Sequence, residues 1–518
     1  MGLISAFFLS AGFVSAVASQ STGLTVHTAQ GDVAGTLVVP TVRQFLGVPY
    51  ATAKRWETPS QPPVRSSVLQ ATAFGDTCVQ ALTPTAVTFL TISGAGGINV
   101  TESENCHTVN IWSPSTNRKQ NTAVMLWIYG GSFQFGTSNI PVYNGQNIVR
   151  DNDDVTVVTF NYRTNIFGQP NAPQLLSTTK SQNFGLLDLD AAVQWVHTNI
   201  AAFGGDPNRI VLFGQSAGSI ATDAYTFAHP QDTIVKGVIQ ESGTLALLRI
   251  GGLSNPTFDD TDWNTIASAV GCGTNNDAAQ FSCMQNVPFR TLEDAVLSTG
   301  TSFNLLTDDI TIFSDVNARA AAGKFLHVPV LGGTTAQEGD ILVVAEELVN
   351  LGFTIPVATE AAADVVTLAA FTCPAGVNAQ QRVHVNVPTW RYQYQAVFPD
   401  ISTRPDLRAY HASEIAIVFG TYNASTSGVP PTPEEIALSK YVQNVWVAFA
   451  KNPARGLIDN LGWPTYNSLT KSFAQLGNAL NKTGVTFTTG ALIDLTCAGA
   501  DALLAATELP GGGPIKIF

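Results

Sequence analysis

The chain has 518 residues, of which 45% are hydrophobic and 12% are charged, and its formal net charge is −13. Globular proteins usually contain about 25% charged residues, so a large share of this chain can be buried. The negative balance argues against nucleic acid and anionic lipid surfaces as partners. No repeat, charge block or Ser/Pro-rich linker divides the sequence, and we expect one large domain over residues 19–518.

The first residues have the pattern of a secretory signal peptide, residues 1–18. Residues 3–17 are almost wholly apolar or small and uncharged, and Ala16, Val17 and Ala18 form a small-x-small site for cleavage before Ser19. The run is too short for a membrane span, and a buried N-terminal helix is the alternative. No later stretch is apolar for long enough to cross a bilayer. We therefore expect a secreted, extracellular and soluble protein without a transmembrane anchor.

The six cysteines of an exported chain indicate three disulfides. The pairs favoured by proximity in the sequence, followed by the pair that remains, are Cys78–Cys106, Cys272–Cys283 and Cys373–Cys497. A zinc site is the alternative, but no C-x-x-C motif or nearby Cys/His cluster supports a metal. Sequons for N-glycosylation, which fit export, occur at Asn99, Asn423 and Asn481.

Strand and helix patterns alternate along the chain. Apolar or alternating runs predict strands at residues 24–28, 32–39, 110–112, 123–128, 154–160, 209–213, 235–240 and 328–331. Helical spacing predicts helices at residues 184–200, 219–227 and 433–449. Several strands are continuously apolar, as in a parallel sheet that is buried on both faces. The alternation predicts an α/β fold with a large, mostly parallel central sheet and helices on both faces.

Ser216 lies in the only G-x-S-x-G motif of the chain, GQSAG at residues 214–218. A predicted strand precedes this motif and a predicted helix follows it. Strand, sharp turn and helix are the context of a nucleophile elbow, which presents a serine hydroxyl above the sheet. An ordinary glycine-rich turn is the alternative. The context favours Ser216 as a nucleophile.

Several further motifs resemble those of the type-B carboxylesterase/lipase family, which includes cholinesterases and secreted fungal lipases. They extend over most of the chain after the signal peptide: FLGVPY at 45–50, SENC at 103–106, NYR at 161–163, NFGLLD at 183–188, FGGDP at 203–207, GQSAG at 214–218 and a histidine motif at 409–414. The resemblance implies an α/β-hydrolase fold, no cofactor, and the cleavage of carboxylic esters through an acyl-enzyme. A small-molecule or lipid ester is the expected substrate.

The nucleophile needs a base, and the base needs an acid that orients it. His411 lies in AYHASE at residues 409–414, which resembles the family segment that carries the catalytic histidine. Glu338 in GGTTAQEG, residues 332–339, occupies the place of the family's acid, with Asp340 and Glu414 as rivals on charge alone. We expect Glu414 to support the site from close to Ser242.

Backbone N–H groups must stabilise the tetrahedral intermediate. Ala217, which follows the nucleophile, is one expected donor. YGGSF at residues 129–133 resembles the family's oxyanion loop and supplies Gly131 and Ser132 as the others. Ser132 stands where the family usually has glycine. The N–H remains, but a side chain narrows the approach and penalises an unusual φ.

The segment between Cys78 and Cys106 resembles the disulfide loop that covers the gorge in this family. In cholinesterases this loop carries a tryptophan that holds the choline cation, whereas residues 79–105 contain no Trp. We expect a lid over a lipophilic group and a preference for uncharged esters, unless an aromatic from elsewhere, such as Phe303 or Phe313, lines the gorge. A stapled surface loop is the alternative for this segment. A catalytically inactive adhesion protein and a transport or storage protein are the alternatives for the whole chain.

Overall fold

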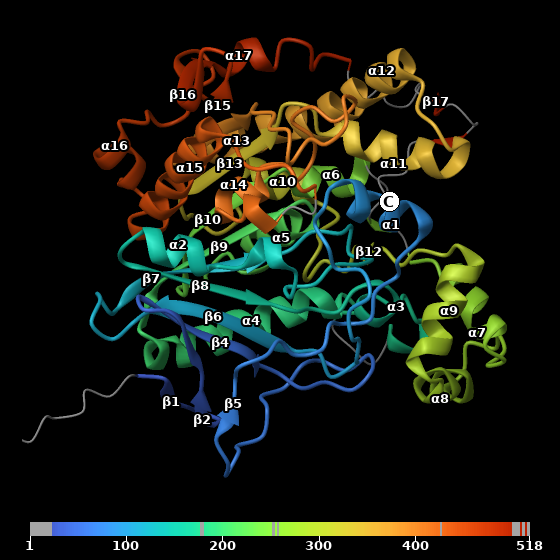
Figure 1. The fold of residues 1–518 in the computed structure, drawn as a ribbon. Helices are drawn as coiled ribbons and strands as arrows, with labels where there is room; N and C mark the ends of the chain where they lie inside the picture. The colour runs from blue at the N-terminus through green and yellow to red at the C-terminus, as the bar shows by residue number, and fades with distance from the viewer. Residues whose placement is uncertain are drawn as a thin grey trace, which may run out of the picture.

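A computed structural model of the chain describes residues 23–176, 181–250, 254–255, 258–424, 427–499, 508–509 and 513–514. The expected signal peptide, residues 1–18, lies outside the described residues. The central element is an eleven-stranded sheet (Figure 1). Its strands, in spatial order, are β16 (Asn481–Thr489), β15 (Lys471–Asn478), β14 (Thr389–Tyr394), β13 (Val330–Thr335), β10 (Val235–Glu241), β9 (Gly205–Gln215), β7 (Thr122–Ile128), β8 (Val155–Phe160), β6 (Thr108–Pro114), β4 (Val42–Pro49) and β3 (Thr36–Val39).

The strands from β15 to β8 pair with one another in parallel, and the antiparallel pairs lie outside this stretch, towards the two ends of the sheet. Every residue of β6, β7 and β8 is buried, as expected for strands covered on both faces. The smaller pairings are β1 (Thr25–Thr28) and β5 (Leu69–Gln70) on β2 (Gly31–Ala34), β11 (Ser254–Asn255) on β12 (Leu305–Leu306), and β17 (Glu508–Leu509) on β18 (Gly513–Pro514).

Helices lie on both faces of the sheet (Figure 1). They are α1 (Pro84–Ile92), α2 (Gln146–Asp151), α3 (Asn165–Gly168), α4 (Phe184–Asn199), α5 (Ala217–Ala228), α6 (Leu245–Ile250), α7 (Thr261–Ala269), α8 (Ala278–Asn286), α9 (Phe289–Thr299), α10 (Val316–Ala321), α11 (Gly339–Leu351), α12 (Pro356–Val366), α13 (Cys373–His384), α14 (Ile415–Phe419), α15 (Pro433–Lys451), α16 (Gly456–Leu461) and α17 (Gly490–Ile493). This architecture confirms the expected α/β-hydrolase fold.

The predicted strand at residues 32–39 is wrong in one respect, because the chain divides there into β2 and β3 at Gly35. A Cβ at Gly35 would lie 2.4 Å from the carbonyl oxygen of Gln44, so only glycine allows this close approach. The N–H of Gly35 donates to the carbonyl of Leu24, which extends the pairing of β2 with β1, whereas β3 pairs with β4. The two halves therefore join different sheets.

A second apolar core lies beside the main one, at the edge of the molecule formed by α7, α8 and α9 (Figure 1). Trp263, Met284 and Leu292 of these helices are fully buried in it. A disulfide joins Cys272 to Cys283 within this group. The other two disulfides are Cys78–Cys106 and Cys373–Cys497, so the structure contains the three pairs expected from the sequence.

One helical stretch, Pro356–His384, is long and apolar enough to cross a membrane by length and composition alone. This finding corrects the expectation that no segment after residue 18 meets that test. A π-helical segment, Thr367–Thr372, joins α12 to α13 within it. More than half of its most apolar part is buried inside the molecule, as in a core helix of a soluble protein.

Candidate active site

Ser216 forms the turn between β9 and α5 with φ 56° and ψ −123°. Its N–H donates to the carbonyl of Glu241 at 2.8 Å, which ties the turn to β10. A Cβ at Gly214 would lie 2.5 Å from the carbonyl oxygen of Gly218, and a Cβ at Gly218 would lie 1.9 Å from that of Ile128. Both glycines are therefore required by close backbone approach, and the turn presents Ser216 at the N-terminus of α5.

Glu338 and His411 meet through their side chains. Nδ1 of His411 lies 2.6 Å from Oε2 of Glu338, and Oε1 of Glu338 accepts the N–H of Thr335 at 2.7 Å. Glu338 is fully buried and His411 is 3% exposed. The ring of Phe371 packs 4.9 Å from the imidazole. A carboxylate buried against an imidazole fixes both the orientation of the ring and the nitrogen that carries the proton.

The two rival acids make other interactions. Asp340 accepts two hydrogen bonds from the guanidinium of Arg408, at 2.7 and 2.9 Å, whereas the carboxylate bonded to the imidazole is that of Glu338. Neither carboxylate oxygen of Glu414 hydrogen-bonds to any described residue, and the same holds for the hydroxyl of Ser242. The expected support of the site by Glu414 through Ser242 therefore has no direct hydrogen bond in this structure.

Two buried carboxyl groups nevertheless surround the acid. Burial raises the pKa of Glu414 well above its usual value, and the nearby Glu241 and Glu338 raise it further. Burial also raises the pKa of Glu241 to about 8, although the indole N–H of Trp446 donates to it at 2.8 Å. Burial therefore favours the neutral form of both groups, which limits repulsion among neighbouring carboxyl groups.

Ser216 and His411 line the same cavity, yet the serine hydroxyl makes no hydrogen bond within the described part of the chain. Instead, Nε2 of Gln215 lies 3.1 Å from Nε2 of His411. Gln215 is 3% exposed and lines the cavity beside Ser216. Hydrogen bonds between nucleophile and base are often absent or long in ligand-free enzymes and shorten once a substrate is bound.

The loop after β7 presents unpaired backbone donors. Gly131 has φ 109°, and a Cβ there would lie 2.2 Å from the carbonyl oxygen of Phe135. Ser132 follows with φ 53°, an unusual value for a residue with a side chain. Among described residues, the N–H groups of Gly131, Ser132 and Ala217 have no acceptor. Three free donors beside Ser216 suit an oxyanion.

A cavity of about 150 Å³ opens around Ser216 and His411. Phe89 and Leu90 of α1 form part of its wall, together with Ile140, Tyr143 and Ile415 from other parts of the chain. Phe303 and Phe313 are not among its lining residues, but three other aromatics from outside the 78–106 loop are: Phe135, Tyr143 and Tyr410. Among the described residues that form its wall there is no Asp, Glu, Lys or Arg.

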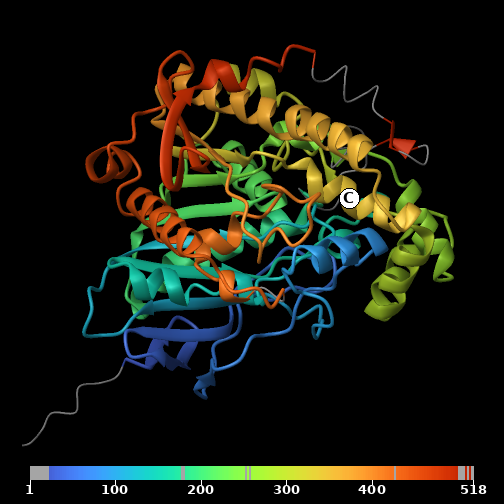
Figure 2. The ribbon, with the colours of Figure 1, turned by 45° about the horizontal axis from the view of Figure 1, so that its top comes forward.

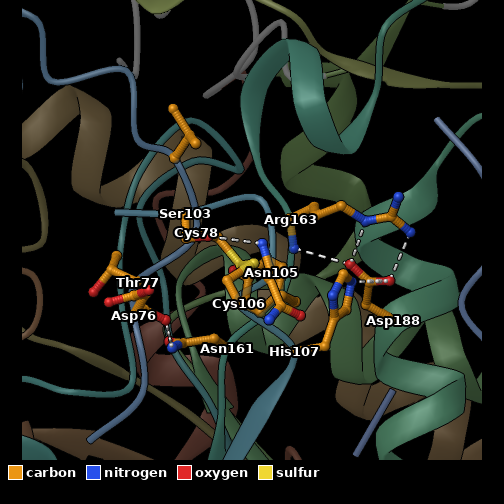
Figure 3. Close-up of a disulfide and its surroundings, with 12 residues drawn as sticks. Asp76, Thr77, Cys78, Ser103, Asn105, Cys106, His107, Asn161, Arg163 and Asp188 are labelled. Carbon is orange, nitrogen blue, oxygen red and sulfur yellow. Dashed lines mark hydrogen bonds and ion pairs between the residues drawn. A yellow bond between two sulfur atoms is a disulfide. The ribbon is translucent and has the colours of Figure 1, made fainter. Parts of the chain in front are cut away.

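The segment that carries α1 is held at its base by the Cys78–Cys106 disulfide and the groups beneath it (Figure 3). Two nitrogens of Arg163 donate to Asp188 at 2.8 and 2.9 Å, and Nε2 of His107 lies 3.1 Å from the same carboxylate. Burial alone would raise the pKa of Asp188, but Arg163 and His107 outweigh burial and hold it well below its usual value. The base of the loop is therefore a buried, charge-paired anchor.

Away from the disulfide, the segment packs against α11 through α1. Figure 2 shows α1 beside α11, and the two helices are in contact. Their one hydrogen bond between side chains in the described part runs from Thr85 to Glu346, at 3.0 Å. Phe89 and Leu90, one turn further along α1, are buried and line the cavity. The helix thus closes one wall of the site without being built into the sheet.

The sequence profile of the carboxylesterase family matches residues 22–350 and 356–490. The chain belongs to the carboxylesterase family. It is 33% identical over 447 residues to a chlorogenic acid esterase of Aspergillus niger, with 84% of each chain covered. It is 32% identical over 466 residues to secreted lipase 5 of Gibberella zeae, with 83% of this chain and 85% of the lipase covered.

Solved structures agree with these relatives. A PNB esterase structure superposes on 90% of this chain and 97% of its own, with a TM-score of 0.72 and 28% identity. A carboxylesterase fold and these relatives make the protein a carboxylic ester hydrolase that acts on ester substrates. The alternatives of an inactive adhesion protein and of a storage protein are therefore not supported. The three disulfides and a secreted relative fit an extracellular protein.

Sequence reasoning missed three features of the site. One is Gln215, which directly precedes Ser216 and whose amide lies 3.1 Å from His411. Helix α1 has no strong helical periodicity, but Thr83 with Pro84 is a helix-start signal, and the Thr83 hydroxyl accepts the N–H of Ala86. The buried carboxyl of Glu241 had no signal in the sequence, because only tertiary packing removes it from water.

Proposed function

We propose that this chain is a secreted serine esterase in which Ser216, His411 and Glu338 form the catalytic triad. His411 takes the proton of the Ser216 hydroxyl while the oxygen attacks the ester carbonyl. The proton then passes to the leaving alcohol, and an acyl-enzyme remains. Water, deprotonated by the same imidazole, releases the carboxylic acid and restores the serine.

Glu338 orients the imidazole and stabilises the imidazolium that forms, and the N–H groups of Gly131, Ser132 and Ala217 bind the oxyanion. Removal of one such donor typically costs about 10²–10³ in rate. The hydrogen bond from His411 to Glu338, together with free donors beside Ser216, supports these assignments.

The substrate is an uncharged ester with a lipophilic group. The observation that carries this proposal is the absence of any charged Asp, Glu, Lys or Arg side chain from the described cavity wall. A charged substrate would lose its hydration there without gaining a partner, which costs several kcal/mol or more. The segment 78–106, through α1, acts as a lid over the apolar part of the substrate.

The proposed secretion depends on residues 1–18 acting as a signal peptide, within one domain over residues 19–518. Of the proposed glycosylation sites, Asn99 and Asn423 are exposed, whereas Asn481 is half-buried and its amide donates to the carbonyl of Val485. Sequencing the N-terminus of protein collected from a culture medium tests the first point, with Ser19 as the expected first residue.

The test of the chemistry is Ser216→Ala, assayed with p-nitrophenyl esters of increasing chain length. The variant removes the attacking oxygen and little volume, so hydrolysis should be lost while the melting temperature is kept. The matched control is Ser219→Ala in the next turn of α5, whose hydroxyl donates to the carbonyl of Gly243. Substantial hydrolysis by the Ser216 variant would overturn the assignment of the nucleophile.

A further inference from the structure

To take the serine proton, the proposed base needs the lone pair on Nε2 of His411, and that nitrogen already has a hydrogen-bond partner. Oε2 of Glu338 accepts a hydrogen bond from Nδ1 of His411, so the proton of the neutral imidazole sits on Nδ1. Nε2 is then an acceptor with a single lone pair. The group that lies against it, at 3.1 Å, is the side-chain nitrogen of Gln215, an amide that donates two N–H bonds.

The surroundings of Gln215 hold the amide in this position. Its side chain is buried at the end of β9, and its Oε1 lies over the loop residue Gly130, where a Cβ would be 2.9 Å away. The same Cβ would lie 2.8 Å from the Cβ of Ser216, so a glycine at residue 130 leaves room for both side chains. Ser216, by contrast, has no hydrogen bond to hold its hydroxyl toward His411 within the described residues.

We propose that Gln215 is a positioning residue that occupies Nε2 of His411 in the substrate-free enzyme and competes there with the hydroxyl of Ser216. This inference depends on the proposed function, since it presupposes that Ser216 is the nucleophile and His411 the base. The resting enzyme is held in a state in which its serine is not activated. An ester that docks over Ser216 releases the imidazole by displacing the amide.

The competition has a definite dependence on pH. A hydrogen bond between two uncharged groups stabilises the bonded state by a net factor of about five over the unbonded state. Once Nε2 is protonated, an amide N–H faces an imidazolium N–H and the bond is lost, so Gln215 affects only the neutral imidazole. Removing the amide should raise reactivity of Ser216 about fivefold at high pH and leave it unchanged at low pH.

Other titratable groups near His411 do not differ between the wild-type chain and a Gln215 variant. Glu338 lies on Nδ1. Glu241 at the end of β10 and Glu414 just before α14 lie around that carboxylate, and Tyr392 of β14 is close to all three. They influence the pH dependence of the labelling rate in both proteins alike. A change in the shape of the profile therefore reports on Gln215.

The experiment measures the second-order rate constant for phosphonylation of the serine by a small fluorophosphonate from pH 5 to pH 9, followed by fluoride release. The variant is Gln215→Met, which keeps the length of the side chain and cannot donate. We expect the rate constant at the high-pH plateau to be about fivefold higher than in wild type, the midpoint of the profile to lie about 0.7 pH unit higher, and the two curves to coincide at low pH. A second variant, Gln215→Asn, keeps the amide but is one methylene too short, and should behave alike if the methionine variant does not fold.

The matched control is Gln393→Met in β14, a buried glutamine whose partner is Gln395 at 2.7 Å, far from the imidazole in the hydrogen-bond network. Its profile should coincide with that of the wild-type chain. A Gln215→Met plateau equal to or below wild type, or a shift of the whole profile without convergence, would overturn the inference. If Ser216→Ala is still labelled, the proposed nucleophile fails; if labelling is lost in Ser216→Ala but Gln215→Met is no faster, only this inference fails.

Discussion

Nδ1 of His411 lies 2.6 Å from a carboxylate oxygen of Glu338, although 73 positions separate the two residues in the chain. Their loops are joined by a backbone bridge one residue earlier in each, between Gln337 and Tyr410. The side chain of Gln337 adds a hydrogen bond from the N–H of Ala409 at 3.2 Å. The backbone thus fixes the distance between acid and base before either side chain is considered.

Glu338→Gln should lower kcat by about 10³–10⁴ with little change in fold, because an amide no longer holds the imidazole in the required tautomer. Steady-state kinetics with a p-nitrophenyl ester give the change. The control is Asp340→Asn, two positions on, whose carboxylate pairs with Arg408. This control should lower the melting temperature and leave kcat within a few-fold of wild type. The reverse pattern would make Asp340 the acid.

Ser132→Gly should keep kcat and leave the protein as stable as before or slightly more stable, by up to about 1 kcal/mol. The backbone N–H remains in the variant. Glycine adopts a φ of 53° without the steric strain that a residue with a side chain has there. Gly131→Ala makes the contrast, since its Cβ would lie 2.2 Å from the carbonyl oxygen of Phe135 at a φ of 109°. Here we expect kcat to fall by about 10²–10³. Equal losses in both variants would contradict the assignment of the loop.

Glu241→Gln should change how stability depends on pH. Burial raises the pKa of Glu241 to about 8, above its usual value, so between about pH 5 and 8 the folded protein holds a proton that the unfolded chain has released. Stability of the wild-type chain is therefore lost as the pH rises through this window. The glutamine has no such loss.

Urea unfolding at pH 5 and pH 8 measures the effect. The free energy of unfolding of Glu241→Gln, relative to wild type, should be larger at pH 8 than at pH 5 by at least about 1 kcal/mol. The control Glu434→Gln, exposed in the first turn of α15, should show the same difference from wild type at both pH values. A relative stability of Glu241→Gln that is constant or falls would show that Glu241 is ionised in the fold.

Neutral esters should be preferred over choline esters. A desolvated cation on a tryptophan face gains about 2 kcal/mol, or roughly thirtyfold in affinity, but the described residues that line this cavity include no carboxylate and no tryptophan. The comparison is kcat/KM for butyrylcholine against that for 3,3-dimethylbutyl butyrate, which has the same shape without the charge. A tenfold preference for the charged ester would show that the reading of the cavity is wrong.

The sequence by itself determined the framework of the site. Continuous apolar runs such as residues 123–128 predicted buried strands, and the glycines around Ser216 predicted the sharp turn, because each depends on local sterics and on burial of its own side chains. The motifs further down the chain predicted Glu338 and His411 as acid and base by their resemblance to those of the carboxylesterase family, to which this chain belongs.

Only the tertiary structure decided which side chains meet. Glu338, directly before α11, hydrogen-bonds to His411, whereas Asp340 pairs with Arg408. Arg408 lies 68 positions further along the chain than Asp340. The amide of Gln215 reaches the imidazole because Gly130, on another strand's loop, leaves room for it. The charge of Glu241 depends on its burial behind the sheet. Each of these outcomes is a contact or a loss of water between segments that are distant in sequence, and local patterns carry no record of it.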